Sequence, residues 1–332
     1  MTVALLVLQF AACAALVAWA GTALSRSADR LATIHDWGRG WVGLALLATV
    51  TSLPELASGV SAVTLVDAPN LAVGNALGAC VVNLAFLVVV DLLQRRQPLY
   101  RHASPSHLLS AGFGVVMLGL VAMSLVTGRA VPVLLGVGLY SPLLLGLYLL
   151  ALRSVFHHER AHRGGEEPAA KRRQPVGREW WRFGAAALVV LAAGSWLPEV
   201  ADGLARELGL SRSFVGTVFM ALVTTLPEMA VTLAALRLGA LDMAIGNLLG
   251  SNLFNVVVIA VDDLAYTQGP LLADVSPVHA GTAAAALVMT GLVIIGLVMR
   301  PQGRVLRVLS WISAGLVAAG LINATLVYLA GT

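Results

Sequence analysis

Ten apolar runs of about 20 residues each divide this chain, and their length restricts its fold more than any other feature. A helix of about 20 apolar residues is long enough to cross the hydrocarbon core of a bilayer. With 58% apolar and 11% charged residues, too little polar surface remains to solvate ten such helices as a soluble protein. A membrane β-barrel would instead show period-two alternation. The sequence therefore predicts an all-α polytopic membrane protein with spans at 3–24, 40–65, 70–92, 107–126, 131–152, 183–204, 213–237, 241–264, 277–299 and 306–329.

The first run, 3–24, has no basic residues before it and is long for the apolar part of a signal peptide, so we expect a retained helix. Cys13 and Cys80 both lie inside apolar runs. We expect them to be small buried hydrophobic residues that form no disulfide framework.

Lysine and arginine are unevenly shared between the loops. If the N-terminus lies outside, 18 of the 21 Lys and Arg residues fall on the cytoplasmic side. Because cytoplasmic loops carry the excess of positive charge, we expect a multi-pass protein of the cell (plasma or inner) membrane with both termini outside. The long charged loop, 153–182, is expected in the cytoplasm as a solvated linker.

The chain contains an internal repeat. "TSLPE" at 51–55 returns as "TTLPE" at 224–228, and "GNALG" at 74–78 returns as "GNLLG" at 246–250. The similarity is strongest between 40–92 and 213–264, and it predicts a first five-helix unit at 1–152 and a second at 183–332. Five spans is an odd number, so the second unit enters the membrane from the opposite side and the repeats are inverted.

A proline and a glutamate stand side by side in the middle of one span of each unit. Pro54 and Pro227 remove a backbone donor and free carbonyl groups of the preceding turn. Glu55 and Glu228 place carboxylates near the membrane midplane, where an ionised side chain costs about 2.5–3.5 kcal/mol on insertion scales. Because something must offset both costs, we expect the two motifs to bind an ion.

Neighbouring residues complete a set of oxygen donors. Thr51 and Ser58 share a helix face with Glu55, and Thr224 and Thr232 flank Glu228 at four residues on either side. In the following spans amides and a hydroxyl recur at i, i+4 spacing, at Asn75, Asn83, Asn247, Ser251 and Asn255. The small-x-x-x-small pairs that would let these helices approach closely are Gly74 with Gly78 and Gly246 with Gly250.

We expect no thiolate cage and no histidine in the membrane core, which disfavours zinc, copper and iron and favours a hard cation. Two carboxylates neutralise one divalent ion, and six to eight oxygen ligands suit calcium better than magnesium. Glu55 and Glu228 are the titratable groups that we expect in this core. Asp262 and Asp263 stand at the outer end of the span at 241–264. They could attract cations there, but we expect an ordinary wetted helix end.

In the two repeated motifs, "TSLPE" with "GNALGACVVN" and "TTLPE" with "GNLLGSNLFN", the sequence resembles the cation/calcium exchanger superfamily, nearest its sodium/calcium exchanger branch. The resemblance implies that Glu55 and Glu228 are the calcium carboxylates and that Thr51 and Thr224 give backbone oxygens. It places side chains for sodium or the central ion cluster at Ser52, Thr225, Ser251, Asn83 and Asn255. It also implies alternating access in which spans one and six slide past the other eight.

Two positions depart from the family pattern. Ala79 stands where the family often has a hydroxyl, and Asn255 stands where sodium/calcium exchangers often have aspartate. The expected function is a secondary transporter that exchanges Ca²⁺ for Na⁺. The alternative is a proton-coupled antiporter of Ca²⁺ or another divalent cation, which could use the two glutamates to carry at most two protons.

Other classes of function find less support. A passive cation channel would conduct without a counter-ion gradient, and a membrane enzyme acting on lipid phosphates usually needs metal-bridging aspartates or a His/Arg set. We expect no enzyme activity, no cofactor, no nucleic acid and no obligate protein partner beyond the lipid bilayer. The basic loops are explained by topology alone.

Overall fold

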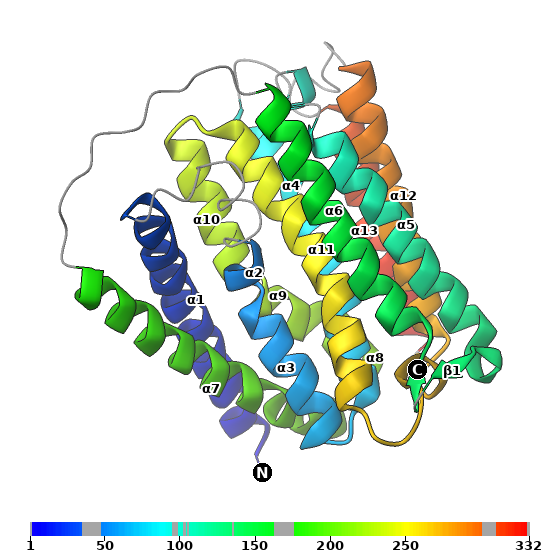
Figure 1. Ribbon diagram of the computed structural model, residues 1–332. Helices are drawn as coiled ribbons and strands as arrows, with labels where there is room; N and C mark the ends of the chain where they lie inside the picture. Colours follow the sequence, from blue (N-terminus) through cyan, green and yellow to red (C-terminus); the bar gives the residue numbers. More distant parts are fainter. Residues whose placement is uncertain are drawn as a thin grey trace.

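The computed structural model describes residues 2–34, 48–94, 99–101, 104, 106–134, 136–162, 176–300 and 310–330. Its described part is a bundle of mostly long helices (Figure 1). Seven of these helices are long and apolar enough to cross a membrane, and the bent pair 212–224 and 226–237 adds an eighth if it counts as one span. The sequence prediction of a helical membrane protein is therefore confirmed at this coarser level.

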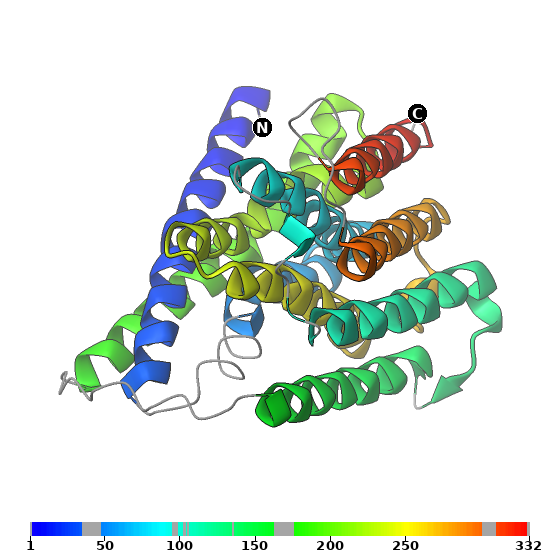
Figure 2. The ribbon, with the colours of Figure 1, turned by 90° about the horizontal axis from the view of Figure 1, so that it is seen from above.

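Two long helices lie together at one edge of the bundle. α1 (Val3–Ile34) and α7 (Val176–Leu208) pack against each other, and Figures 1 and 2 show them side by side. Each of these helices contacts a Pro–Glu motif through a glycine. A side chain at Gly21 of α1 would overlap Pro227, and a side chain at Gly194 of α7 would overlap Ala57 and press on the Pro54 carbonyl. The edge pair is thus seated on the two Pro–Glu motifs.

Two other helices form the centre. α4 (Pro69–Leu93) and α11 (Leu241–Ala265) pack against each other, and 94% of the most apolar window of α11 and 67% of that of α4 are buried, against 22% for α1. Helices that are apolar or small on all sides belong inside a bundle. Around them lie α5 (Ser106–Thr127), α6 (Tyr140–His162), α12 (Val278–Met299) and α13 (Trp311–Leu329).

The two Pro–Glu spans are interrupted helices. The first consists of α2 (Ala48–Thr51) and α3 (Leu53–Thr64), and its expected beginning at 40–47 lies outside the described residues. The second consists of α8 (Arg212–Phe214), the π-helical turn η4 (Val215–Met220), α9 (Ala221–Thr224) and α10 (Leu226–Arg237). Short 3₁₀ turns occur at η2 (Leu99–Arg101), η3 (Gly128–Ala130) and η5 (Leu271–Ala273).

Several expected boundaries were wrong. The span expected at 131–152 begins at Tyr140, because 131–139 contains a small antiparallel hairpin of β1 (Val133–Leu134) and β2 (Val137–Gly138) that follows Pro132. α1 continues to Ile34, and α6 and α7 both extend into the range expected as linker, 153–182. Hydropathy marks the apolar part of a helix, and a helix can continue past it into water. Residues 163–175 lie outside the described part.

Two aspartates tie distant helices together in the same way. Asp91, near the end of α4, accepts hydrogen bonds from the Leu99 N–H at 3.3 Å, the Ser310 N–H at 2.9 Å and the Ser313 hydroxyl at 2.7 Å. Ser310 is the N-cap of α13. Asp91 therefore satisfies free N–H groups at the start of α13 and places a negative charge at that positive helix end.

Asp263, near the end of α11, does the same for α6. It accepts from the Leu271 N–H at 2.7 Å, the Gly138 N–H at 3.0 Å and the Ser141 hydroxyl at 2.5 Å. All three donors stand 172 positions after or before the donors of Asp91, as Asp263 itself does. The Tyr140 hydroxyl adds a fourth bond at 2.7 Å. Asp262 and Asp263 are both fully buried, so the expectation of a wetted helix end was wrong.

A second matched pair involves histidines, which we did not expect among the membrane helices. His107 Nε2 lies 3.0 Å from the Asp242 carboxylate, and His279 Nε2 lies 3.1 Å from the Asn70 side-chain oxygen. Both imidazoles are almost completely buried, at the first turns of α5 and α12. The expectation that the membrane core contains no histidine was therefore wrong for these buried residues. Neither histidine bonds to a residue of the Pro–Glu motifs.

Candidate cation site

Each Pro–Glu motif begins a new helix segment after a local break. Ser52 separates α2 from α3 with φ −89° and ψ 13°, and Thr225 separates α9 from α10 with φ −80° and ψ 0°. The prolines follow in the first turn of each new segment, where a missing N–H is tolerated. The second pair of segments is bent by 42°. Proline thus acts at both sites as the sequence predicts.

The two glutamates are completely buried. Glu228 accepts a hydrogen bond from the Ser52 hydroxyl, with 2.8 Å between Ser52 Oγ and Glu228 Oε1. Ser52 precedes Glu55 by three residues, so this bond joins the break of one motif to the carboxylate of the other. Glu228 Oε2 and both oxygens of Glu55 have no hydrogen-bond partner.

Further bonds connect the motifs to the central helices. Thr224 Oγ1 donates to Asn75 Oδ1 at 3.0 Å, and Thr51 Oγ1 lies 3.4 Å from Ser251 Oγ. Asn247 donates to the backbone carbonyl of Glu228 at 3.3 Å. The residues that these bonds join come from α2, α4, α9, α10 and α11, so the predicted oxygen donors of both motifs meet between the central helices.

The site holds an unusual set of unsatisfied acceptors. Both oxygens of Glu55, Glu228 Oε2 and Asn247 Oδ1 are buried without a hydrogen-bond partner. Asn83 on α4 and Asn255 on α11 carry further unpartnered oxygens, and so do described residues outside the two motifs, such as Asp262 and Thr282. Buried polar groups in folded proteins are nearly always hydrogen-bonded, and an ion is one explanation for those that are not. Carboxylate and amide oxygens are the donor type that calcium prefers.

Other predicted residues lie beside the site in supporting positions. Thr225 donates to the Ala221 carbonyl at 2.8 Å, which turns its proton into its own helix. Thr232 accepts from Asn247 at 3.2 Å, while Ser58 donates to the Gly194 carbonyl on α7 at 2.9 Å and so faces away. Ser58 is therefore a contact between helices, contrary to the expectation that it belongs to the hydroxyl stripe of Glu55.

The predicted glycine pairs have unequal contacts. A side chain at Gly78 would overlap the backbone of Thr217 in η4, and one at Gly74 would press on the backbone of Gly216 and Thr217. The pair therefore lets α4 approach η4 directly. Gly246 and Gly250 are buried in α11.

Sequence reasoning missed one central contact. Cys80 Sγ lies 3.7 Å from the Asn252 carbonyl, and Asn252 Nδ2 donates to the Cys80 carbonyl at 3.3 Å. The two residues stand 172 positions apart, so the same position of each repeat meets its counterpart where α4 crosses α11. The repeat alignment could have indicated this pair, because residues at a symmetry axis contact their own equivalents.

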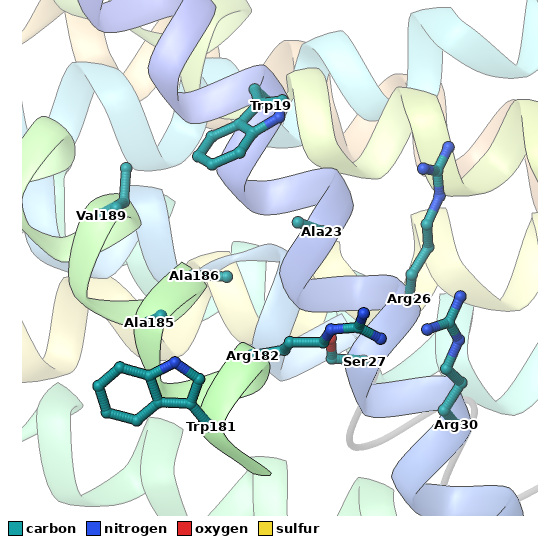
Figure 3. Close-up of a pocket in the computed structure, with 10 residues that line it drawn as sticks. All are labelled: Trp19, Ala23, Arg26, Ser27, Arg30, Trp181, Arg182, Ala185, Ala186 and Val189. Atoms are coloured by element: carbon teal, nitrogen blue, oxygen red, sulfur yellow. The ribbon is translucent and has the colours of Figure 1, made fainter. Parts of the chain in front are cut away.

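A cavity of about 460 Å³ lies elsewhere, between α1 and α7. Figure 3 shows the three arginines that line it, Arg26 and Arg30 from α1 and Arg182 from α7. Glu179 pairs with Arg30 at 3.4 Å and with Arg182 at 2.7 Å, which leaves the lining positive. Like charges repel, so this cavity does not suit a cation, and the candidate cation site is the buried oxygen cluster.

Several membrane proteins resemble this chain over about two thirds of its length. The inner membrane protein YrbG of Escherichia coli (strain K12) is 27% identical over 249 residues, which cover 68% of this chain and 72% of YrbG. The putative antiporter CaxA of Alkalimonas amylolytica is 26% identical over 232 residues, 66% of this chain and 67% of CaxA. Each of these two matches thus covers about two thirds of this chain.

The fold also matches a solved structure. The sodium-calcium exchanger NCX_Mj, soaked with Na⁺ and Sr²⁺, superposes with a TM-score of 0.64 and 20% identity, over 97% of this chain and 98% of that one. At that identity the likeness shows the fold. The family described as sodium/calcium exchanger protein matches residues 5–153 and again 178–326, which together are most of the sequence. This chain belongs to the sodium/calcium exchanger protein family.

Proposed function

We propose that this protein is a secondary active antiporter of the cell membrane that exchanges Ca²⁺ for Na⁺ by alternating access. The observation that carries the proposal is the group of buried, unpartnered oxygens around Glu55 and Glu228. Two carboxylates in a membrane interior are costly unless a cation shares them. A calcium ion would neutralise both, and the amide oxygens of Asn83, Asn247 and Asn255 are proposed as further ligands.

The proposed ligand roles are those that the family resemblance implies. Glu55 and Glu228 would be the calcium carboxylates, with backbone oxygens of Thr51 and Thr224 beside them. The side chains that would complete the calcium and sodium positions are Ser52, Thr225, Ser251, Asn83 and Asn255. Asn75 and Asn247 would hold the motifs in place through their bonds to Thr224 and to the Glu228 backbone.

The chain would be built from two inverted repeats of five spans, 1–152 and 183–332, joined by a cytoplasmic linker around 153–182, with both termini outside. The matched bonds of Asp91 and Asp263, and those of His107 and His279, support this arrangement, since each contact recurs at the same offset. The excess of Lys and Arg in the loops assigned to the cytoplasm supports the orientation.

Alternating access would involve α1 and α7, the first helices of the two repeats. These helices pack on each other at the bundle edge and rest on the proline breaks through Gly21 and Gly194. α3 is held to α7 by side chains that bond to carbonyl groups, Ser58 to Gly194 and Ser61 to Ser195 at 2.5 Å. Movement of α7 along α3 would exchange these bonds and open the site to one side of the membrane.

Sodium is proposed as the coupling ion, because neutral hydroxyl and amide oxygens such as those of Ser251 and Asn83 can bind it without titrating. Protons remain the alternative, since carboxylates can also carry them.

The experiment is calcium uptake into proteoliposomes that contain the purified full-length protein at clamped voltage. An outward sodium gradient should drive uptake, and a pH gradient alone should not. Glu55→Gln or Glu228→Gln should abolish it, and Glu199→Gln, an exposed glutamate on α7, should leave it unchanged. Uptake driven by pH alone would assign protons as the coupling ion, uptake without any counter-gradient would indicate a channel, and wild-type rates in either site variant would remove that glutamate from the mechanism.

A further inference from the structure

Asp262 is a buried acid that neither the helix caps nor the candidate cation site uses. It lies three residues before the end of α11, is completely buried, and has no hydrogen-bond partner on either carboxylate oxygen. Its neighbour Asp263 accepts four hydrogen bonds. The position that matches Asp262 in the first half of the chain is Val90, whereas Asp263 matches Asp91. The fold therefore explains one of the two adjacent aspartates and leaves the other without a structural task.

The Asp262 carboxylate lies against the backbone of α3. A side chain at Gly59 would overlap it, so the acid occupies the space that only glycine leaves free. Gly59 follows Glu55 by one helical turn, and Asp262 follows Asn255 by two turns on the helix face that contacts α3. Asp262 thus lies beyond the cation site, farther along the contact between α3 and α11 and toward their C-terminal ends.

This contact runs toward one face of the membrane. The segments that follow α3 and α11 meet there, because Gln268 Nε2 donates to Asp67 Oδ1 at 2.9 Å, and Asp67 is exposed. The ends of α3 and α11 are Thr64 and Ala265. Asp262 therefore lies about one helical turn, or roughly 5 Å, inside this face, and the cation site lies deeper in the bundle.

No hydrogen bond or ion pair of the described residues brings a positive charge to this carboxylate, and at the same face Arg129 pairs with Asp274 at 3.3 Å instead. The arginines on helices packed against α11 lie far from it: Arg237 is next to the start of α11, and Arg153 is 13 residues along α6 from Tyr140, about 20 Å. The other titratable side chains described on these helices and on α11 itself are Glu55, Cys80, Asp91, His107, Tyr140, Tyr148, His157, His158, Glu228, Asp242 and Asp263. None of them bonds to Asp262.

An isolated, fully buried carboxylate costs several kcal/mol in a protein interior, and a proton is the one cation that needs no cavity and no further ligands. Resting on the function proposed above, we propose that Asp262 is a proton-binding site of the transport cycle. It is a neutral carboxylic acid in the arrangement described here. It releases its proton to water at the face beside Asp67 in one state of the transport cycle and takes one up in the other.

This site changes what the cycle can carry. Glu55 and Glu228 alone offer two titratable carboxyls, and Asp262 adds a third that does not share the calcium ion. Protons that compete with calcium at Glu55 and Glu228 are displaced by saturating calcium. A proton on Asp262 is not displaced, so pH dependence that persists at saturating calcium and is lost when Asp262 is replaced belongs to Asp262.

The test uses the full-length protein in lipid. Infrared spectra of the wild type at neutral pH should contain the C=O stretch of a protonated carboxylic acid. Subtraction of the Asp262→Asn spectrum from the wild-type spectrum should reveal this band. Subtraction of the spectrum of Asp67→Asn, which replaces an exposed acid at the same face, should not. Calcium flux at saturating calcium should depend on pH in the wild type and in Asp67→Asn, and this dependence should be lost in Asp262→Asn.

Asp262→Val provides a second variant, because valine is the residue at the matching position 90. It removes a buried polar group without a partner, so it should fold with an unchanged or higher Tm and show the same loss of pH dependence. An unchanged infrared band together with a wild-type pH profile in both Asp262 variants would overturn the proton site. If the wild type itself transported no calcium, the proposed function would be overturned instead. The infrared band would still report on Asp262.

Discussion

The hydroxyl of Ser52 donates a 2.8 Å hydrogen bond to Glu228, so the break in the first Pro–Glu helix orients the carboxylate of the second. The reverse bond does not occur, because Thr225, the counterpart of Ser52, donates to the Ala221 carbonyl of its own helix. Glu55 is left with two unpartnered oxygens. The two carboxylates thus differ in their protein partners, because Glu228 accepts the Ser52 hydroxyl and Glu55 has no equivalent bond from Thr225.

Removal of the Ser52 hydroxyl should weaken calcium binding. Hydrogen bonds to charged groups contribute about 1.5–3 kcal/mol, so we expect Ser52→Ala to raise the calcium Kd at least about tenfold. Calorimetric titration of the purified protein measures this change. Thr64→Ala is the matched control, because Thr64 is exposed on the same helix and bonds only to the Val60 carbonyl. Equal affinities in Ser52→Ala and the wild type would show that the bond does not orient Glu228 for the ion.

Removal of the Glu55 charge should separate ligand binding from folding. In EDTA, Glu55→Gln should unfold at the same or a higher temperature than the wild type, because a buried charge without a partner is replaced by a neutral amide. Calcium at about 100 times its Kd stabilises a protein by about 2.7 kcal/mol, and Glu55→Gln should lose this calcium-dependent rise in Tm. Thermal unfolding in detergent, with Glu199→Gln as control, gives both numbers. A variant that is destabilised in EDTA would assign Glu55 a structural role.

Close packing of α4 on η4 makes a further prediction. Gly78→Ala should lower the unfolding free energy by about 1–3 kcal/mol, because its new methyl group would overlap the Thr217 backbone. Gly119→Ala on α5 has open space around it and should be neutral or slightly stabilising. The two variants, compared by thermal unfolding, differ only in what surrounds the added methyl. Equal stabilities would mean that α4 and η4 can move apart without cost.

Much of the candidate site follows from local sequence. Pro54 and Pro227 predict the helix breaks because a missing N–H acts within one turn, whatever the rest of the chain does. The positions of Glu55 and Glu228 within apolar runs predict burial and hence a compensating ion. The repeat then brings the two motifs together as a pair, and the bond from Ser52 to Glu228 agrees with that expectation.

The remaining features depend on contacts between distant residues. Asp263 looked like the wetted end of a helix because its four donors lie on β2, on α6 and at the start of η5, which its own neighbourhood in the sequence does not reveal. The hairpin at 133–138 was hidden because Val133 and Leu134 are as apolar as a membrane helix. Asp262 was missed for the same reason as Asp263, since the glycine that makes room for it lies on α3.

Replacement by asparagine should change the unfolding free energy at one of the two adjacent aspartates and not at the other. Asp263→Asn places an amide N–H₂ where four donors converge, so it should lower the unfolding free energy by several kcal/mol, since each buried donor left without an acceptor costs about 1–3 kcal/mol. Asp262→Asn should leave it unchanged, because no donor loses a partner. Denaturation of both variants under identical conditions makes the comparison. Similar losses in the two would indicate that Asp262 also has a structural partner.

Protons should compete with calcium at the two glutamates, and the sign follows from charge. Protonation neutralises Glu55 and Glu228, so the calcium Kd should rise as the pH falls, by up to about a hundredfold per pH unit where both carboxyls are protonated in the free protein. Calcium binding should then release protons into weakly buffered solution, which a pH indicator counts directly. Sodium bound only by hydroxyl and amide oxygens should release none. Release of protons on addition of sodium alone would mean that sodium reaches the carboxylates too, and that the two ions share the Glu55 and Glu228 site in turn.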